Sequence, residues 1–261
     1  MSPINHIYKY FTLAFCFTLA NAQERPFLFT IVPQIGTSNS VVLHYDLAYG
    51  KETFEPLGGD NIEQTFGIQT GISESFMLVG QFSFATDDLT THSSQRIELL
   101  GQAFNAQDHA FDFSVGPGFL HEYGGTNVLL ARGVIGRHFT SWQIYGNCLL
   151  EKAFSENRDP VDLFLTTGFS YSLSPSLHLG FEAVGQDLEG FWDTTEAEGG
   201  ATLFAGPTIT AAIPTTSWTL NLGAGPIVRA THSIQTSFAP RDIPASAKNG
   251  FVVHAIINFG V

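Results

Sequence analysis

Residues 161–186 read VDLFLTTGFSYSLSPSLHLGFEAVGQ, and the alternation within this stretch decides the fold. In residues 161–173 every second side chain is mostly apolar, and the side chains between them are mostly polar or small. Residues 174–176, Ser-Pro-Ser, form a turn, and the alternation resumes over residues 177–186. Because successive side chains of a strand point to opposite faces, this pattern predicts a β-hairpin with one apolar and one polar face.

The hairpin unit recurs along the chain, and the connections between strands alternate between long and short. Short turns at one end, longer loops at the other and an even strand count are typical of outer-membrane barrels, whose apolar face meets lipid. A secreted sandwich, the alternative, has no reason to show this order, and closure leaves no strand edge in lipid. We therefore predict an all-β fold: an antiparallel up-and-down transmembrane β-barrel of about 12 strands in the bacterial outer membrane, formed by residues 40–261. The expected strands cover residues 40–49, 65–72, 76–85, 96–104, 110–121, 127–138, 142–152, 161–173, 177–186, 200–212, 217–229 and 249–261.

The first 22 residues have the pattern of a cleaved secretory signal. A short polar start precedes the apolar run 11–19 and then Ala20-Asn21-Ala22, so we expect cleavage before Gln23. The apolar run is shorter than the about 20 residues that a membrane-spanning helix needs. Cys16 is preceded by a bulky Phe15 and followed by further apolar sequence, which argues against a lipoprotein.

Residues 23–39 are expected to form an N-terminal segment that leads into the barrel. They contain a short apolar run, residues 27–32, followed by Pro33 and Gly36. This run is compatible with a stray strand or with an ordered segment outside the sheet, and both interpretations stay open at this stage.

Composition restricts the partners. Without residues 1–22 the formal charge of −13 becomes −14, from 10 basic and 24 acidic side chains, and so acidic a chain is a poor partner for nucleic acid. Cys148 is then the remaining cysteine, so no intramolecular disulfide is expected. The expected partners are outer-membrane lipids, the barrel-assembly machinery and small-molecule solutes, and no cofactor is expected.

Three Gly-Pro pairs fall inside expected strands: Gly116-Pro117, Gly206-Pro207 and Gly225-Pro226. Proline cannot donate a hydrogen bond to a neighbouring strand. We expect bulges or bends at these positions.

A family resemblance rests on three features of the chain. They are Leu179-Gly180-Phe181-Glu182-Ala183, the acidic loop over residues 187–199, and Gly206-Pro207 in the strand that follows. Together they resemble the outer-membrane transporters of the phenol-degradation meta-pathway family, and the resemblance, which covers most of the chain after residue 22, implies a porin-like channel. Such barrels usually end in an aromatic residue that the assembly machinery reads. Here Phe259, two residues before the end, alternates with the lipid-facing residues of the last strand, and we expect it to serve as the aromatic residue that the assembly machinery reads.

Ten charged or titratable side chains on the polar face are expected to line the lumen. Acids outnumber arginines among them, so we expect a passive pathway for small solutes that favours cations. Alternatively, these residues hydrogen-bond one another and fill a narrow interior, since wide aqueous pores are typical of about 16–18 strands; the protein would then be a closed structural or receptor barrel. The expected lumen-lining residues are Asp46, Glu98, Asp112, Arg132, Glu151, Asp162, His178, Glu182, Arg229 and His254.

Catalysis is not expected. Outer-membrane lipid hydrolases need a serine or aspartate nucleophile with a histidine partner in hydrogen-bond reach. The nearest candidate, His92-Ser93-Ser94, falls in the expected loop 86–95 and lacks the glycine and asparagine pattern of those enzymes.

No metal site is expected either. His44, His178 and His254 stand singly, without the spacing of metal ligands. The acids of residues 187–199 lack the spacing of a calcium loop, so a solvated acidic loop is the expected interpretation. Trp142, Trp218 and Tyr171 lie near short turns, where we expect an aromatic girdle.

Overall fold

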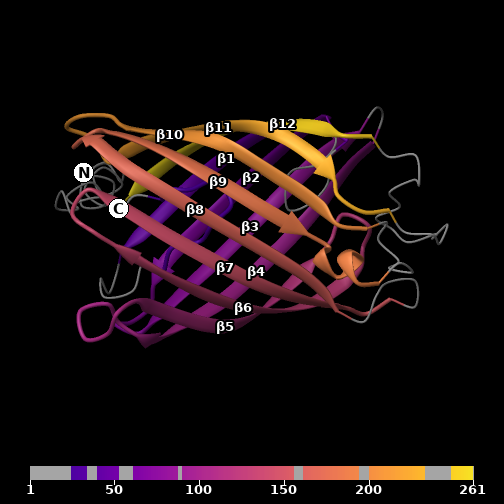
Figure 1. Ribbon diagram of the computed structural model, residues 1–261, viewed down its shortest axis with the longest axis horizontal. Coiled ribbons are helices and arrows are strands. Elements are labelled where there is room, and N and C mark those ends of the chain that lie inside the picture. Colours follow the sequence, from indigo (N-terminus) through magenta and orange to yellow (C-terminus); the bar gives the residue numbers. More distant parts are fainter. Residues whose placement is uncertain are drawn as a thin grey trace, which may run out of the picture.

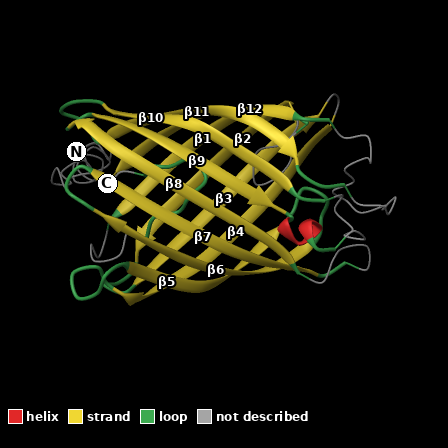
Figure 2. Ribbon diagram, viewed as in Figure 1, coloured by secondary structure: helices red, strands yellow, loops and turns green. Residues whose placement is uncertain are grey.

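The chain forms a closed antiparallel barrel of twelve strands (Figures 1 and 2). The computed structural model describes residues 25–33, 40–52, 61–87, 90–155, 161–193, 200–232 and 248–260. Each strand pairs with its neighbour in sequence, and β1 pairs with β12 to close the barrel. The strands are β1 (Val41–Lys51), β2 (Asn61–Gly71), β3 (Phe76–Asp87), β4 (Thr90–Phe104), β5 (Asp112–His121), β6 (Asn127–His138), β7 (Trp142–Ala153), β8 (Asp162–Ser174), β9 (Leu177–Gln186), β10 (Thr202–Ala212), β11 (Trp218–Arg229) and β12 (Gly250–Gly260).

The predicted fold class, strand number and topology are confirmed. Two expected connections are wrong in part. β4 begins at Thr90 within the expected loop 86–95, where Thr91 pairs with Thr86, and β2 begins at Asn61 rather than at residue 65. This part of β4 is rich in threonine, serine and histidine, so it lacks the apolar alternation by which the other strands were found. A strand that continues beyond the lipid does not need an apolar face.

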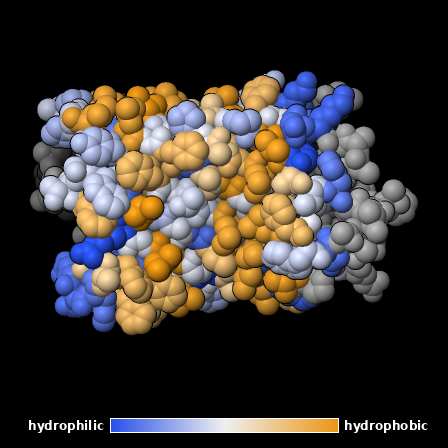
Figure 3. Space-filling view, viewed as in Figure 1, coloured by the Kyte–Doolittle hydropathy of each residue, from blue (hydrophilic) through white to orange (hydrophobic). Residues whose placement is uncertain are grey.

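The outer face of the barrel is apolar at mid-height. Leu165 and Phe181 point outward and are 43% and 48% exposed, whereas their neighbour Glu182 points inward and is fully buried. Figure 3 shows apolar side chains spread over the strands, with polar side chains gathered toward the two ends. A closed sheet satisfies its backbone groups internally, and an apolar outer face then requires lipid around it. This is the architecture of a bacterial outer-membrane barrel.

Aromatic side chains lie at the short-turn end. Trp142 begins β7, stacks on Phe139 with ring centroids 3.8 Å apart, and pairs across the strands with Tyr171. Trp218 packs on Phe259 at 4.7 Å. In outer-membrane barrels such a girdle sits at the membrane interface, and the short-turn end faces the periplasm.

The Gly-Pro pairs do not insert bulges. In β10 and β11 the pairing is interrupted between Phe204 and Thr208, and its register is the same on both sides. A Cβ on Gly206 would lie 2.2 Å from the carbonyl oxygen of Ala224. Glycine is therefore required because the two backbones approach closely there, and Pro207 follows with its ring on the outer face.

The start of the acidic loop is buried, so the expectation of a solvated loop is wrong for Asp187 and Glu189. Asp187 has a left-handed backbone (φ 50°) and is followed by the 3-10 helix η1 (Leu188–Phe191). The backbone N–H of Leu163 donates to Glu189 Oε2 at 2.8 Å. This carboxylate caps an amide of β8 beyond its pairing with β9, while residues 194–199 lie outside the described part of the chain.

Within the described residues, no helix is long and apolar enough to cross a membrane. The expected signal, residues 1–22, also falls outside the described part of the chain, and so do residues 233–247 of the loop before β12.

The two faces can be distinguished by a charge. Phe181→Arg should destabilise the folded barrel by about 2–4 kcal/mol, because it places a cation in lipid near mid-height. Gln102→Arg, at an inward-facing position of β4 two residues after Leu100, is the matched control, and it should cost much less. Heat-modifiable mobility on SDS gels and urea titration in detergent micelles measure the difference in stability. An equal loss of stability in both variants would contradict the assignment of Phe181 to the lipid face and of the control position to the lumen face.

Candidate functional site

Residues 25–33, here called the lumen segment, lie inside the barrel and cross it. The segment forms no strand, so its backbone groups are not satisfied by the sheet. A buried amide without a partner costs free energy, so the barrel wall must supply the partners. In the structure the apolar run 27–32 forms no strand and lies outside the sheet.

Glu182 on β9 is the main attachment point of the lumen segment. Its carboxylate accepts hydrogen bonds from three consecutive backbone amides: Leu28 N to Oε2 at 2.7 Å, Phe29 N to Oε1 at 3.0 Å and Thr30 N to Oε1 at 2.9 Å. Glu182 is fully buried. Hydrogen bonds to a charged acceptor are the stronger ones, at roughly 1.5–3 kcal/mol each.

Polar side chains of four further strands bind the same segment, among them Thr166 on β8, whose hydroxyl bonds that of Thr30 at 3.1 Å. Asn147 on β7 accepts from Ile31 N at 2.9 Å and donates to Ile31 O at 3.0 Å, as a neighbouring strand would. Asn221 on β11 donates to the carbonyl of Arg25, and Thr210 on β10 donates to that of Pro26 at 3.4 Å. These hydrogen bonds hold the segment against the β7–β11 side of the lumen.

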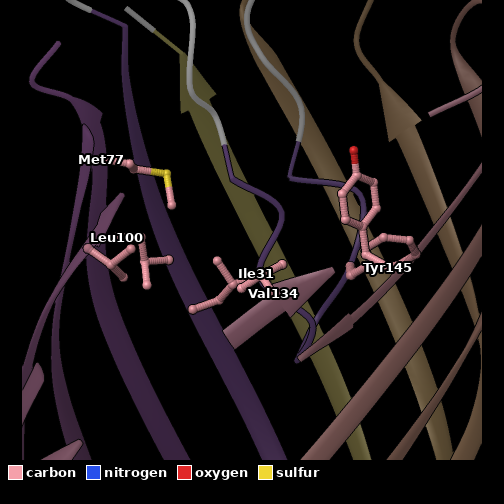
Figure 4. Packing of buried hydrophobic residues seen from close by; sticks show 7 residues of the cluster. Ile31, Met77, Leu100, Val134 and Tyr145 are labelled. Atoms are coloured by element: carbon pink, nitrogen blue, oxygen red, sulfur yellow. The ribbon is translucent and has the colours of Figure 1, made fainter. Parts of the chain in front are cut away.

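The apolar side chains of the lumen segment fill the spaces that the polar contacts leave. Phe27 and Ile31 pack in one cluster on the β3, β4, β6 and β7 side, several of whose members are seen in Figure 4. Phe29 packs on a second cluster on β9–β12 and lies 5.1 Å from the ring of Phe204 and 4.8 Å from that of His254. The members of the first cluster are Phe27, Ile31, Met77, Val79, Leu100, Val134 and Tyr145.

Two wall glycines make room for these side chains. A Cβ on Gly168 would lie 2.6 Å from the ring of Phe27, and one on Gly223 would lie 2.4 Å from Cδ1 of Leu28. Any other residue at these positions would push the segment off the wall. The wall and the segment are therefore complementary in shape as well as in hydrogen bonding.

A buried ion cluster faces the segment from β4 and β6. Arg96 donates to Glu98 Oε1 at 2.6 Å, and Arg132 donates to Glu98 Oε2 at 2.7 Å. Arg132 also donates to Asn147 at 3.0 Å, which connects the cluster to the amide that holds Ile31. The sequence analysis overlooked Arg96, although it shares the parity of Glu98.

The remaining expected lumen residues are spread along the barrel. Their structural partners are as follows: Asp46 bonds His254 at 3.1 Å, Asp112 accepts from the Tyr145 hydroxyl at 3.2 Å, His178 bonds Ser172 at 2.9 Å, Arg229 donates to Thr202 and to the carbonyl of Glu52, and Glu151 pairs across the strands with Asp162, both buried.

The residues considered for a metal site and for a catalytic site do not assemble as such sites require. His44, His178 and His254 do not come together, and the described residues contain no group of three or more histidine, cysteine or acidic side chains placed to hold a metal. His92-Ser93-Ser94 lies in β4 rather than in a loop, with His92 exposed and Ser94 buried.

Beside the lumen segment a cavity of about 80 Å³ remains, here called the lumen cavity. Its charged lining comes from Asp46, Glu63, Arg96 and Arg132 on the wall and from Arg25 on the segment. Arg25 is only 5% exposed, and its Nη2 donates to the carbonyl of Leu28. The segment thus leaves a small charged space beside it on the β1–β6 side.

Solved outer-membrane barrels have the same fold. A NanC porin structure superposes with a TM-score of 0.59 at 8% identity, covering 83% of this chain and 98% of that one. A KdgM porin in complex with disordered oligogalacturonate gives 0.54 at 10% identity (84% and 98%), and the COG4313 outer membrane channel from Pseudomonas putida F1 gives 0.53 at 10% (92% and 100%). No family model matches the sequence, and neither does any curated protein. Identities this low show a shared fold.

Removing the carboxylate should loosen the lumen segment. In Glu182→Ala the amides of residues 28–30 lose their acceptor, and we expect their hydrogen exchange to rise roughly a hundredfold, since each unmet buried donor costs about 1–3 kcal/mol. Glu182→Gln retains one acceptor oxygen, so the exchange rate of these amides should lie between the rates in Glu182→Ala and in the parent. Gln81→Ala, on the far wall, is the control. Unchanged exchange in Glu182→Ala, measured by mass spectrometry, would mean that packing alone holds the segment.

Proposed function

We propose that the protein is a passive outer-membrane channel for small solutes whose lumen is kept closed by its own N-terminal segment. The observation that carries this proposal is the bonding of three consecutive amides of residues 28–30 to the single carboxylate of Glu182. A carboxylate buried only to fill a barrel would be matched by a cation. Here its hydrogen bonds come from backbone amides of a segment that is not part of the wall, and the cation whose charge acts on it, Arg25, belongs to the same segment.

The attachment of the segment supports a removable closure. None of its hydrogen bonds belongs to the sheet, so the barrel can lose the segment without losing a strand. The wall groups that would be freed, Asn147, Thr210, Asn221 and Glu182, are all polar and can be hydrated. An open state therefore exposes these polar groups, together with the apolar wall side chains that now contact Phe27, Phe29 and Ile31.

The competing function is a permanently closed structural or receptor barrel. It is favoured by the two apolar clusters, which bury Phe27, Phe29 and Ile31 against the wall. The two candidates differ in whether removal of the segment opens a path for ions. The three similar structures are named as porins or as a channel rather than as enzymes, which supports a function without catalysis.

A preference for cations is part of the proposal. Among the described inward-facing side chains, Arg25 and Arg96 add to the arginines expected from the sequence, and Glu63 adds to the acids. Carboxylates still predominate toward the long-loop end, where Glu151 and Asp162 are paired neighbours. Partly dehydrated carboxylates on a narrow wall attract cations and repel anions.

We also propose that the chain belongs with the phenol-degradation meta-pathway transporters. The support is the hairpin motif that places Glu182 under the lumen segment, together with Gly206-Pro207 at the close approach of β10 and β11. The first motif supplies the acceptor for the amides of the lumen segment, and the second allows the close approach of two strands.

Deleting residues 25–33 should raise single-channel conductance in planar bilayers several-fold, and Glu182→Ala should give intermediate or flickering openings. The reason is that the segment occupies the lumen at mid-height. Gln81→Ala should behave like the parent, and heat-modifiable mobility confirms that each variant is folded. A folded deletion variant that conducts no better than the parent would leave the closed-barrel function standing.

Charge selectivity can then be measured in the deletion variant. Adding Glu151→Gln and Glu182→Gln should shift reversal potentials across a KCl gradient toward lower cation preference. The shift should be largest at low salt, because screening shortens to about 10 Å at 0.1 M. Glu74→Gln, in an exposed turn outside the lumen, is the matched control. If it causes the same shift as the double change, the lumen acids do not set selectivity.

A further inference from the structure

The lumen cavity has walls of opposite charge. Asp46 on β1 and Glu63 on β2 line it on one side, and Arg96 on β4 and Arg132 on β6 line it on the other. β3 separates the two sides with uncharged polar groups, among them Gln81, which pairs with Arg96 across the strands. Opposite charges on two walls of a low-dielectric space set up a field across it.

Arg25 brings a further cation into this cavity from the lumen segment. Its side chain is buried, and its Nε and Nη1 atoms have no hydrogen-bond partner among the described residues. A guanidinium presents its donors as a rigid fork that fits the two oxygens of a carboxylate. Both donors are covered by protein, and the carboxylates of Asp46 and Glu182 lie near enough to act on the charge of Arg25. A carboxylate ligand in the cavity would engage these donors when the Arg25 side chain turns toward it.

The acids on the other side restrict that ligand further. Glu63 accepts from the Thr65 hydroxyl at 3.2 Å, and Asp46 bonds His254. Each carboxylate has about four acceptor positions, so both can also accept from an ammonium group. A simple anion would be repelled by these acids, and a simple cation would be repelled by Arg25 and by Arg96 and Arg132, whose two charges share the single carboxylate of Glu98.

We propose that the lumen cavity is a binding site for a small zwitterion of the α-amino-acid type, with its carboxylate on Arg25 and its ammonium toward Glu63 and Asp46. A volume of about 80 Å³ suits a solute of a few non-hydrogen atoms. The proposal deepens the proposed function, on which it rests, by naming the class of solute that meets the closed lumen. Since Arg25 belongs to the lumen segment, the ligand touches both the wall and the closure.

The test compares three probes of similar size on the purified full chain in micelles: glycine, acetate and methylammonium, each labelled with ¹³C and followed by NMR line broadening. Glycine should bind in the millimolar range, and acetate and methylammonium at least about tenfold more weakly, because each engages one wall and is repelled by the other. Equal binding of glycine and acetate, or no binding of glycine, would overturn the proposal.

Variants locate the site. Arg25→Gln and, independently, Glu63→Gln should each weaken glycine binding at least about tenfold, the loss expected for one charged hydrogen bond. Arg137→Gln, an exposed arginine at the short-turn end that donates to Ala110 O, is the matched control. Glycine binding that survives both lumen changes overturns the site.

The outcome is separable from that of the proposed function. If the deletion of residues 25–33 opens the channel but glycine does not bind the parent, the zwitterion site fails and the channel stands. If glycine binds as expected but the deletion variant does not conduct, the site stands in a barrel that is a receptor.

Discussion

The interior of this barrel depends on one interaction: a buried carboxylate bonded to three consecutive backbone amides. The Glu182 carboxylate accepts from the amides of Leu28, Phe29 and Thr30, and these three residues lie outside the strands. Each side satisfies what the other would otherwise bury unpaired, at a cost of several kcal/mol for the charge. The position of the lumen segment follows from this pairing, and so does the pairing of Asn147 with Ile31 further along the segment.

The packing of the wall is arranged around the same segment. Gly168 and Gly223 leave room for Phe27 and Leu28, and Leu100 and Phe204 point inward to meet the apolar side chains of the segment. A water-filled pore would need neither the space left by these two glycines nor apolar side chains that point inward. The lumen therefore combines a polar middle, which suits solutes and ions, with apolar contacts that suit a filled interior.

The sequence predicted the barrel because strand alternation is a local property. Residues 161–186 show it within a single hairpin, and the strand pairing observed there follows the predicted turn. It missed the start of β4, since Thr90 to Gln95 carry no apolar face to detect. It placed Glu182 on the polar face but could not say what it bonds, because its partners lie 152–154 residues away in the chain. Arg25 gave even less signal, because its surroundings come from strands far along the chain: Asn221 on β11 binds its carbonyl, and its side chain lines a cavity with residues of β1, β2, β4 and β6.

The long sequence separation between the lumen segment and its partners has a consequence for biogenesis. The segment precedes every strand, but its hydrogen bonds go to β7, β9, β10 and β11, so it cannot dock until most of the barrel exists. Contacts of such high sequence separation form late in folding. Until then Glu182 faces an unfilled and hydrated interior, and the nascent barrel is transiently wider inside than the finished one. Insertion into the bilayer and closure of the lumen are thus two separate events, and the second can be slow, or even reversed, without undoing the first.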